Sequence, residues 1–423
     1  MRYLKASLII AIVSTIIVAG LYIAGFTTLP DRRLIEFYHL PLTNAPLVPY
    51  VLQFALIYIF AWLIAWTTVD IIRPINKAIV AFASVILLLT GSYVLSLYGY
   101  IFTPFHYCAA VLCSFFIGLG YGRSDSGIRK KILQRLFGNR LSTKQFNRLV
   151  DSDIPFAFAG AMQEASVLVC EIRNHEELMA SLNVEDYVAM TNLYLRTATD
   201  YLVDVGGFLD ECDGESLRVV FGAPLPDEKH AQLACRTALE LVQRLDNVNK
   251  ECDAKWHKRF DFRIGVNSGY MIAAAYGGTR LGSFSVAGDS VEFARRLCDA
   301  SAYFGARILI ASDTYNLASS TFEARPIELI KRTGDGRRIE IYEILAPKNG
   351  LSSAQAKSRD HFWKGVIYFR EKSWDKAVEE FSSARIQGLP DAVLDYYVQR
   401  VERWRSGRMD ARREQSILLN PVA

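Results

Sequence analysis

The stretch GGFLDECDGESLRVVFGAP, residues 206–224, decides the fold of the water-soluble part of the chain. Two runs rich in apolar residues, Gly207–Asp213 and Ser216–Phe221, flank the dipeptide Asp213-Gly214. Asp-Gly between two such runs is a strong signal for a tight turn. We therefore expect a β-hairpin here. A single hairpin is not stable alone, so the flanking segments must supply further strands and the helices that cover them.

The segments on either side of the hairpin alternate between strand and helix patterns. Upstream, a buried strand is expected over Ala165–Ile172 and a helix over Val184–Val205. Downstream, the patterns predict in order a helix over Asp227–Leu245 capped by Asp227, a strand over Phe260–Ile272, a helix over Asp289–Phe304, a strand over Arg307–Ala311 and a β pair within 321–345. Mixed strands, helices and hairpins of this kind predict an α+β domain, which we place at residues 160–347.

Two acidic residues lie where this domain brings strand ends together. Glu171 ends the first strand, and Glu215 lies at the tip of the hairpin. Two carboxylates at neighbouring strand ends can hold divalent cations against phosphate groups. Solvated surface charges are the other interpretation, because most glutamates have that role. From the residues alone both interpretations stay open.

Residues 1–122 form a membrane region. They hold only nine of the 92 charged side chains, and four uncharged runs predict membrane spans near 6–26, 47–69, 78–98 and 104–122. A cleaved signal peptide is the alternative for residues 1–26, although its apolar run is long for that role. No Asp, Glu, Lys or Arg lies inside a span, which argues against a transporter or a proton path.

The positive charges between the spans set the orientation. Nine fall on one side of the membrane, and only Arg32 and Arg33 fall on the other: Arg2, Lys5, Arg73, Lys77, Arg123, Arg129, Lys130, Lys131 and Arg135 form the larger group. The positive side is cytoplasmic, so both termini and the α+β domain are expected there, in a multi-pass protein of the inner or plasma membrane. The outer loop, 27–46, is too short to form a sensor domain.

The charge and cysteine content exclude other classes of protein. A net charge of +4, much of it near the membrane, does not indicate nucleic-acid binding. The seven cysteines include no CxxC pair and no metal-ligand spacing, as expected in a reducing compartment. Cys170 and Cys212 flank the two glutamates, and we expect both thiols to pack in the core.

The segments flanking the α+β domain are predicted to be helical. Residues 123–159 are a basic, amphipathic linker, either a juxtamembrane helix at anionic lipid or a helix that couples the membrane region to the domain. A second short helix there is expected to be capped by Ser142 or Thr143. Residues 358–404 resemble a tetratricopeptide repeat, and one repeat cannot bury its own apolar face. The apolar face of the repeat must therefore dock on residues 391–403, on the α+β domain or on a partner protein. Residues 405–423 form a polar tail.

Several blocks of sequence, in one order, resemble the class III nucleotidyl cyclases, the adenylyl and guanylyl cyclases. The blocks are SVLVCEIRNHEEL (166–178), the hairpin at 206–224, FRIGVNSGYMIAAAYGG (262–278), FSVAGDSVEFARRL (284–297) and YFGARILIASDTY (303–315). RLFGNRLSTKQFNRLV (135–150) is similar to the linker of bacterial membrane cyclases. The resemblance implies an α+β domain with a ferredoxin-like core that acts as a dimer, with two divalent cations, magnesium or manganese, held by one subunit.

The resemblance also implies roles for residues at the metal and base-reading positions. The two metal-binding aspartates of the family fall on Glu171 and Glu215, whose longer side chains predict a preference for manganese over the geometrically stricter magnesium. The base-reading lysine falls on Glu211, the residue type found in guanylyl cyclases, which predicts GTP over ATP because a carboxylate accepts hydrogen bonds from guanine. The second base-reading position falls on Ser285, which favours neither nucleotide.

The remaining positions of the family are only partly retained. The transition-state arginine falls on Arg296, whereas the transition-state asparagine falls on Glu292, whose charge opposes a developing anion. The triphosphate-binding lysine has no clean match, although Lys331 and Arg332 lie near its position, on Thr333. The phosphate-loop Gly-Phe pair falls on Asn174 and His175. His175 beside this loop is a candidate general base, and a surface histidine is the alternative.

These expectations lead to one main hypothesis and two rivals. The main hypothesis is a membrane-anchored cyclase that converts ATP or GTP into a 3′,5′-cyclic nucleotide and pyrophosphate for intracellular signalling. It would act as a homodimer, or as a heterodimer with another cyclase chain, at membrane lipid. One rival is a catalytically degenerate pseudo-cyclase that acts through dimerisation. The other makes the membrane region the functional part, as a small-ligand or lipid sensor.

Overall fold

The computed structural model describes residues 2–38, 50–71, 74–152, 160–277, 282–331 and 338–407. They form two compact units, of which the first comprises residues 1–135 and 150–153 and the second residues 136–149 and 154–423. Each unit has its own hydrophobic core.

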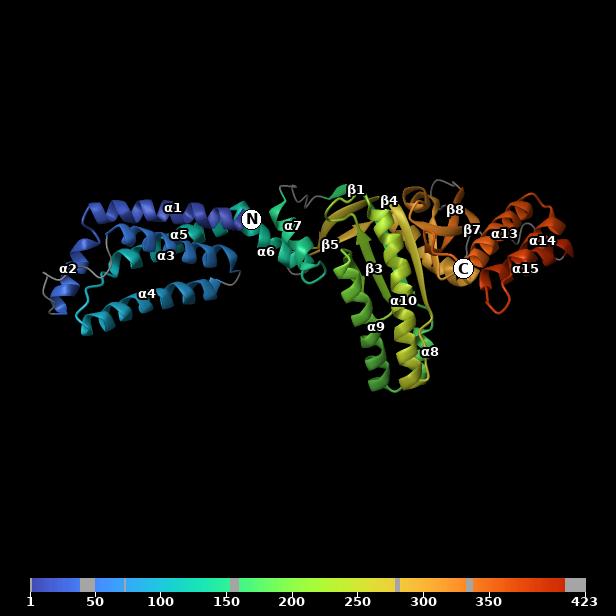
Figure 1. Ribbon diagram of the computed structural model, residues 1–423, viewed down its shortest axis with the longest axis horizontal. Coiled ribbons are helices and arrows are strands. Elements are labelled where there is room, and N and C mark those ends of the chain that lie inside the picture. Colours follow the sequence, from blue (N-terminus) through green and yellow to red (C-terminus); the bar gives the residue numbers. More distant parts are fainter. Residues whose placement is uncertain are drawn as a thin grey trace. The chain divides into compact units, whose positions relative to one another are not determined.

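The first unit contains four helices that are long and apolar enough to cross a membrane. They are α1 (Arg2–Ile23), α3 (Tyr50–Asp70), α4 (Pro74–Leu97) and α5 (Phe105–Arg123) (Figure 1). The uncharged run from 78 to 122 therefore forms two helices, as predicted. The chain turns between them at Gly99, whose φ of 78° is a left-handed conformation that suits glycine, and α5 begins after Pro104.

A short helix that the sequence did not predict, α2 (Thr28–Phe37), lies in the loop expected at 27–46. It buries Asp31, whose Oδ1 accepts a hydrogen bond from the backbone N–H of Phe105 at 3.2 Å. Asp31 Oδ2 lies 3.4 Å from Nδ1 of the buried His106. A buried carboxylate requires such partners, so this pair fixes α2 against the start of α5.

The linker forms two helices, α6 (Asp125–Phe137) and α7 (Thr143–Asp151). Ser142 caps α7, because its Oγ accepts a hydrogen bond from the backbone N–H of Gln145 at 3.3 Å. The fully buried ring of Phe137 lies 5.5 Å from the ring of Phe208 and 4.9 Å from that of Phe284. The end of α6 is therefore part of the core of the second unit.

The second unit is built on one eight-stranded sheet of mixed direction, with the strand order β2-β3-β1-β4-β6-β8-β7 and with β5 paired to β4. The pairing of β4 with β6 is parallel, and the other pairings are antiparallel. This confirms the predicted α+β class. The strands are β1 (Ala161–Ile172), β2 (Phe208–Cys212), β3 (Ser216–Phe221), β4 (Phe262–Gly277), β5 (Gly282–Ala287), β6 (Ile308–Ala311), β7 (Phe322–Lys331) and β8 (Arg338–Pro347).

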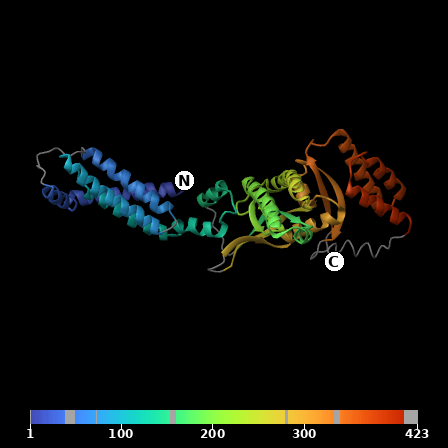
Figure 2. The ribbon, with the colours of Figure 1, turned by 90° about the horizontal axis from the view of Figure 1, so that it is seen from below.

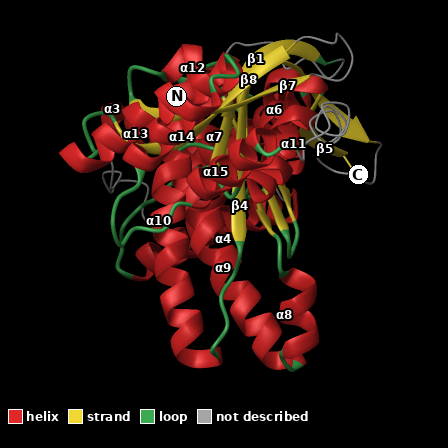
Figure 3. Ribbon diagram, turned by 90° about the vertical axis from the view of Figure 1, so that its right-hand side faces the viewer, coloured by secondary structure: helices red, strands yellow, loops and turns green. Residues whose placement is uncertain are grey.

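Helices cover both faces of this sheet, as the alternation of side chains along β6 shows. Ile308 and Ile310 join one core, with α9 (Val184–Asp204) and α10 (His230–Trp256), which run side by side in Figures 1 and 3. Leu309 and Ala311 point to the opposite face and join a second core, with α11 (Asp289–Phe304). A sheet covered on both faces explains why β6, Ile308–Ala311, is apolar at every position.

The structure corrects several local predictions. Asp227 does not cap α10, which begins at His230; the Asp227 carboxylate instead accepts a hydrogen bond from the backbone N–H of Lys229. That helix also runs eleven residues beyond the predicted end at Leu245. Three described elements of the second unit were not predicted: α8 (His175–Ser181), β5 and α12 (Ser312–Ala318). Each is at most seven residues long, so its periodic pattern is too short to detect.

The C-terminal segment forms three helices, α13 (Ser353–Arg370), α14 (Trp374–Ala384) and α15 (Ala392–Arg405), which lie beside β7 and β8 (Figure 2). Phe362 and Phe381 are fully buried in the core that also contains Ile327 of β7 and Ile341 of β8. Of the docking alternatives, the segment therefore uses both 391–403 and the α+β domain. Residues 408–423 of the predicted tail lie outside the described residues.

Candidate functional site

The two glutamates predicted to lie together are neighbours at one end of the sheet. β1 and β3 are antiparallel, with Glu171 opposite Ser216, and the backbone N–H of Ile172 donates to the carbonyl oxygen of Glu215 at 2.9 Å. Asp213 holds the hairpin turn, because its Oδ1 accepts from the backbone N–H groups of Glu215, at 2.9 Å, and Ser216, at 2.6 Å. The turn thus presents Glu215 beside the end of β1.

Basic side chains surround Glu171. Its Oε1 lies 3.5 Å from Nε of Arg295, and its Oε2 lies 3.5 Å from Nη1 of Arg173. Burial raises the pKa of the Glu171 carboxyl, as does the negative charge of Asp299, while the two arginines oppose this shift. Both oxygens of this carboxylate therefore face guanidinium groups.

Glu215 has a histidine partner. Its Oε1 lies 3.2 Å from Nε2 of His175, the first residue of α8, and Nδ1 of that ring lies 3.2 Å from the carbonyl oxygen of Ile172. Both partners of the imidazole accept hydrogen bonds, so only the doubly protonated ring satisfies both contacts. Both nitrogens of the His175 ring thus contact acceptor oxygens, and neither is free to act as a general base.

These surroundings do not fit a pair of divalent ions at the two glutamates. A cation at Glu171 would have to share the carboxylate with two guanidinium groups, and a cation at Glu215 would have to share it with a histidine. Across the described residues, no three His, Cys, Asp or Glu side chains gather in a way that could hold a metal ion.

The two residues that the resemblance predicts to read the base lie on β2 and β5. Glu211 is exposed on β2, and its Oε2 lies 2.7 Å from Nη1 of Arg218 on the neighbouring strand. Arg218 also donates through Nε to Asp210, at 2.7 Å. Ser285 is half-buried on β5, opposite Ala274 of β4. The carboxylate of Glu211 must therefore share its oxygens with Arg218 before it can contact a base.

The two residues that the resemblance predicts to act on the transition state lie on α11. Arg296 and Glu292 are one turn apart, with 3.8 Å between Arg296 Nε and Glu292 Oε1; Arg296 is half-buried and Glu292 is exposed. The helix lies very close to the sheet at Gly265 of β4, where a Cβ atom would come within 2.2 Å of the carbonyl oxygen of Ala294. Glycine at that position lets α11 approach the strand, and this sets the position of Arg296.

Two further predictions concern the phosphate-binding residues. The Asn174 side chain makes two hydrogen bonds to the backbone. Its Nδ2 donates to the carbonyl oxygen of Arg259, and its Oδ1 accepts from the backbone N–H of Asp261, both at 2.9 Å. Arg332 and Thr333 lie outside the described residues, and Lys331 is described only as the last residue of β7.

The thiols beside the site differ from each other. Cys170 is fully buried, as predicted, and burial raises the pKa of its thiol to about 12. Cys212 is exposed, so the prediction that it packs in the core is wrong. It lies at the end of β2, beside the turn of the hairpin.

Sequence reasoning missed Arg173, Arg295 and Asp299 as members of this site. Arg173 follows Glu171 by two residues, and Arg295 directly precedes Arg296. The sequence does not distinguish either arginine from an ordinary surface charge, because it does not show which face of α11 meets the end of β1. The adjacent arginines Arg295 and Arg296 were the available signal, because neighbouring side chains on a helix point in different directions and one of them can face the site of its own chain.

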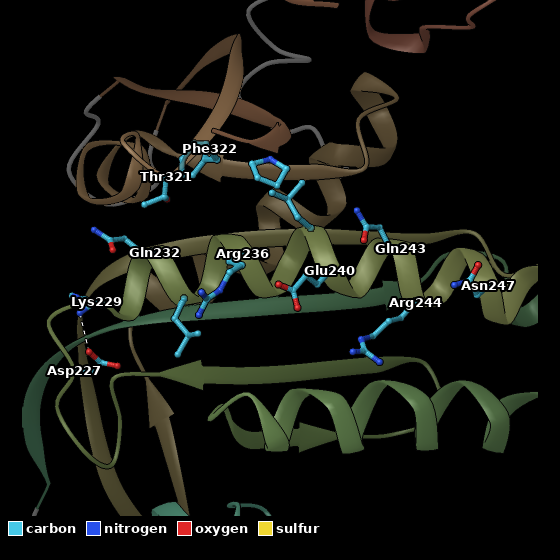
Figure 4. A pocket seen from close by; sticks show the side chains of 13 residues that line it. Asp227, Lys229, Gln232, Arg236, Glu240, Gln243, Arg244, Asn247, Thr321 and Phe322 are labelled. Carbon is cyan, nitrogen blue, oxygen red and sulfur yellow. Dashed lines mark hydrogen bonds between the residues drawn. The ribbon is translucent and has the colours of Figure 1, made fainter. Parts of the chain in front are cut away.

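A cavity of about 960 Å³ lies along α10, away from Glu171 and Glu215 (Figure 4). Polar and charged side chains of that helix line it, together with Thr321 and Phe322 near the start of β7. Glu240 there accepts a hydrogen bond from the hydroxyl of Tyr201 at 2.7 Å, and Arg244 lies over the same ring. None of the residues carried over from the family lines this cavity.

Comparison with known proteins identifies the second unit's sheet domain. The family described as "Adenylate and Guanylate cyclase catalytic domain" matches residues 159–345. "Adenylate cyclase 1" of Rhizobium meliloti (strain 1021) is 24% identical over 194 residues, which are 46% of this chain and 29% of that protein. "Adenylate cyclase" of Anabaena cylindrica is 26% identical over 195 residues, 44% of this chain and 38% of that protein.

Among solved structures, the adenylyl cyclase CyaB from P. aeruginosa is similar, with a TM-score of 0.42 and 24% identity over 46% of this chain and 99% of that one. The chain spans about a third of the length of the two curated relatives. The family match covers the sheet, the hairpin and α11, that is, every element that carries Glu171, Glu215 and Arg296. Residues 159–345 of the chain therefore match the adenylate and guanylate cyclase catalytic domain family.

Proposed function

We propose that the chain is a membrane-anchored nucleotidyl cyclase. The observation that carries this proposal is the family match over residues 159–345, within which Glu171 and Glu215 lie on adjacent strand ends. In the reaction, the ribose 3′-oxygen attacks the α-phosphorus of a purine nucleoside triphosphate, the bond to the β-phosphate oxygen breaks, and pyrophosphate leaves. The 3′-hydroxyl proton passes to a base. Formation of a cyclic nucleotide by the purified full chain, lost in Glu215→Ala, tests this proposal.

The proposed location is the cytoplasmic face of a membrane. Four helices are long and apolar enough to span it, and the positive charges cluster at the chain ends and linkers predicted to face the cytoplasm. A cytoplasmic domain would have direct access to nucleotides. Fusing a reporter to each end of the chain, one active only in the cytoplasm and one only outside it, tests the orientation. A signal from the outer reporter at the C-terminus would contradict the proposal.

Glu211 favours GTP as the substrate. A carboxylate accepts hydrogen bonds from the N–H groups of guanine, while adenine offers a less suitable edge. The ion pair with Arg218 would orient this carboxylate from the neighbouring strand. Competition binding should therefore show tighter binding of GTP than of ATP, and Glu211→Lys should reduce the difference. Tighter binding of ATP that Glu211→Lys leaves unchanged would show that Glu211 does not read the base.

We further propose a dimer with shared sites. In the family, one subunit supplies the carboxylates and its partner supplies the transition-state residues, so Glu215 of one chain should meet Arg296 of the other. A mixture of Glu215→Ala and Arg296→Ala chains then contains heterodimers with one complete site, and activity should reappear on mixing. If the wild-type chain is active and verified heterodimers remain inactive, the shared-site arrangement is wrong.

A degenerate pseudo-cyclase is the second candidate, and two contacts favour it. Arg173 and Arg295 contact the carboxylate at the first metal position, and Glu292 contacts the only transition-state residue type that is retained, Arg296. A chain without activity toward either nucleotide that still dimerises would support this candidate. The C-terminal helices would then serve the domain and not a partner protein, since Phe362 and Phe381 are buried within the chain.

A further inference from the structure

The surroundings of Glu171 form a closed group of two acids and two bases. The Glu171 side chain is 13% exposed, and its two oxygens face Arg295 and Arg173 separately. The Nη1 atom of Arg173 also lies 2.7 Å from Oδ1 of Asp299, one turn beyond Arg295 on α11. Arg173 thus bridges the end of β1 and the helix, and the charges of the four side chains cancel.

This arrangement matches the electrostatic task of a metal ion. A carboxylate that is largely removed from water requires a nearby cation, and a guanidinium group satisfies it with directed N–H donors. A second cation placed against the same oxygens would have to displace an arginine or accept its repulsion at short distance. Glu215 is different, because its side chain is 55% exposed and only one histidine contacts it.

We propose that Arg173 and Arg295 take the place of one divalent cation at Glu171, so that each subunit binds at most one such ion, on the side of Glu215. This inference rests on the proposed cyclase function and specifies the cation requirement of that site. Arg295 is then a specificity-determining residue for the cation. Its side chain is 61% exposed and Arg173 is 39% exposed, so both retain N–H groups that can meet the phosphates of a nucleotide.

The test measures binding of Mn²⁺ alone to the full chain in detergent, by electron paramagnetic resonance of the free ion. Removal of the charge in Arg295→Gln should raise the affinity for Mn²⁺ about two- to fivefold, from the size of ion-pair effects at partly exposed sites. The double variant Arg173→Gln/Arg295→Gln should raise it further and add a second bound ion. Arg295→Lys keeps the positive charge and should stay close to the wild-type chain.

Arg236→Gln is the matched control, because it removes the same charge from an exposed position on α10 that lines the separate cavity. Circular dichroism verifies that each variant is folded. Two ions bound by the wild-type chain, or equal affinities in Arg295→Gln and Arg236→Gln, would overturn the inference. The readout does not require turnover, so a rise in Mn²⁺ affinity in a chain that makes no cyclic nucleotide would refute the proposed function alone.

Discussion

Replacement of Arg325 tests whether the C-terminal helices and the catalytic domain fold as one unit. Arg325 lies on β7 and is 6% exposed. Its Nη2 lies 2.7 Å from Oε2 of Glu343 on β8, and its Nη1 lies 2.6 Å from Oδ2 of Asp391, which caps α15. The guanidinium also stacks over the ring of Phe362 on α13, 4.5 Å from its centroid. One side chain therefore joins β7, β8, α13 and the start of α15.

The cost of Arg325→Met follows from the two carboxylates that it leaves behind. Breaking a buried ion pair by removing one partner costs about 3–5 kcal/mol, because the other charge stays buried. The Asp391 side chain is 24% exposed and keeps part of its hydration, so we expect a value near the lower limit, about 3 kcal/mol. For a domain of this size such a loss lowers the melting temperature by roughly 6–12 °C.

The assay is thermal and urea unfolding of the full chain in detergent, followed by circular dichroism. Arg385→Met is the matched control: its Nη2 lies 2.6 Å from Oδ1 of Asp395, but both side chains are about half exposed, so the loss should stay below about 1 kcal/mol. The double variant Arg325→Met/Asp391→Asn should recover part of the stability. If Arg325→Met lowers the free energy of unfolding no more than Arg385→Met does, the claim that the buried ion pairs of Arg325 join the helices to the sheet is refuted.

Three further predictions concern packing, thiol reactivity and pH. Gly265→Ala should destabilise the chain by about 2 kcal/mol in the same unfolding assay, because its Cβ atom would overlap the backbone of α11; an unchanged melting temperature would contradict this. Cys212 should react with a maleimide before the buried cysteines, faster as the pH rises, because burial and Asp213 raise the pKa of its thiol; mass spectrometry of the labelled peptides checks the order. Burial alone would raise the pKa of the Asp391 carboxyl, but its hydrogen bonds, led by that from Arg325, hold the pKa below the ordinary value. The stabilising contribution of Asp391 should therefore be complete above about pH 4 and disappear as the pH falls further. If Asp391→Asn loses as much stability as the wild-type chain when the pH is lowered, this prediction is refuted.

The sequence predicts the framework of the catalytic domain well because the framework depends on local patterns. The hairpin around Asp213-Gly214 and the helix at Asp289–Phe304 lie where turn chemistry and periodicity place them. Strand β5 escaped prediction because its six residues are paired with β4, and only that pairing makes them a strand. The family resemblance supplied the order of the blocks, which no single segment could provide.

The site is less predictable, since its character depends on contacts between segments far apart in the chain. Glu171 and Glu215 could be placed together, because the hairpin and the first strand must be neighbours. The arginines that contact Glu171 could not be identified, because Arg295 reaches it only through the packing of α11 on β4. The same reason hid the docking of the C-terminal helices, which depends on the shared apolar core and on buried ion pairs such as those of Arg325 with Asp391 and Arg400 with Glu328.

Cyclic nucleotide formation by the purified full chain tests the central claim most directly. The chain is incubated in detergent with ATP or GTP, each with manganese or magnesium, and the products are separated by chromatography, with Glu215→Ala as the inactive control. We expect a cyclic nucleotide and pyrophosphate in equal amounts, more from GTP than from ATP and more with manganese than with magnesium. Absence of cyclic product under all four conditions, from a folded chain that dimerises, would contradict the claim that the chain is a cyclase.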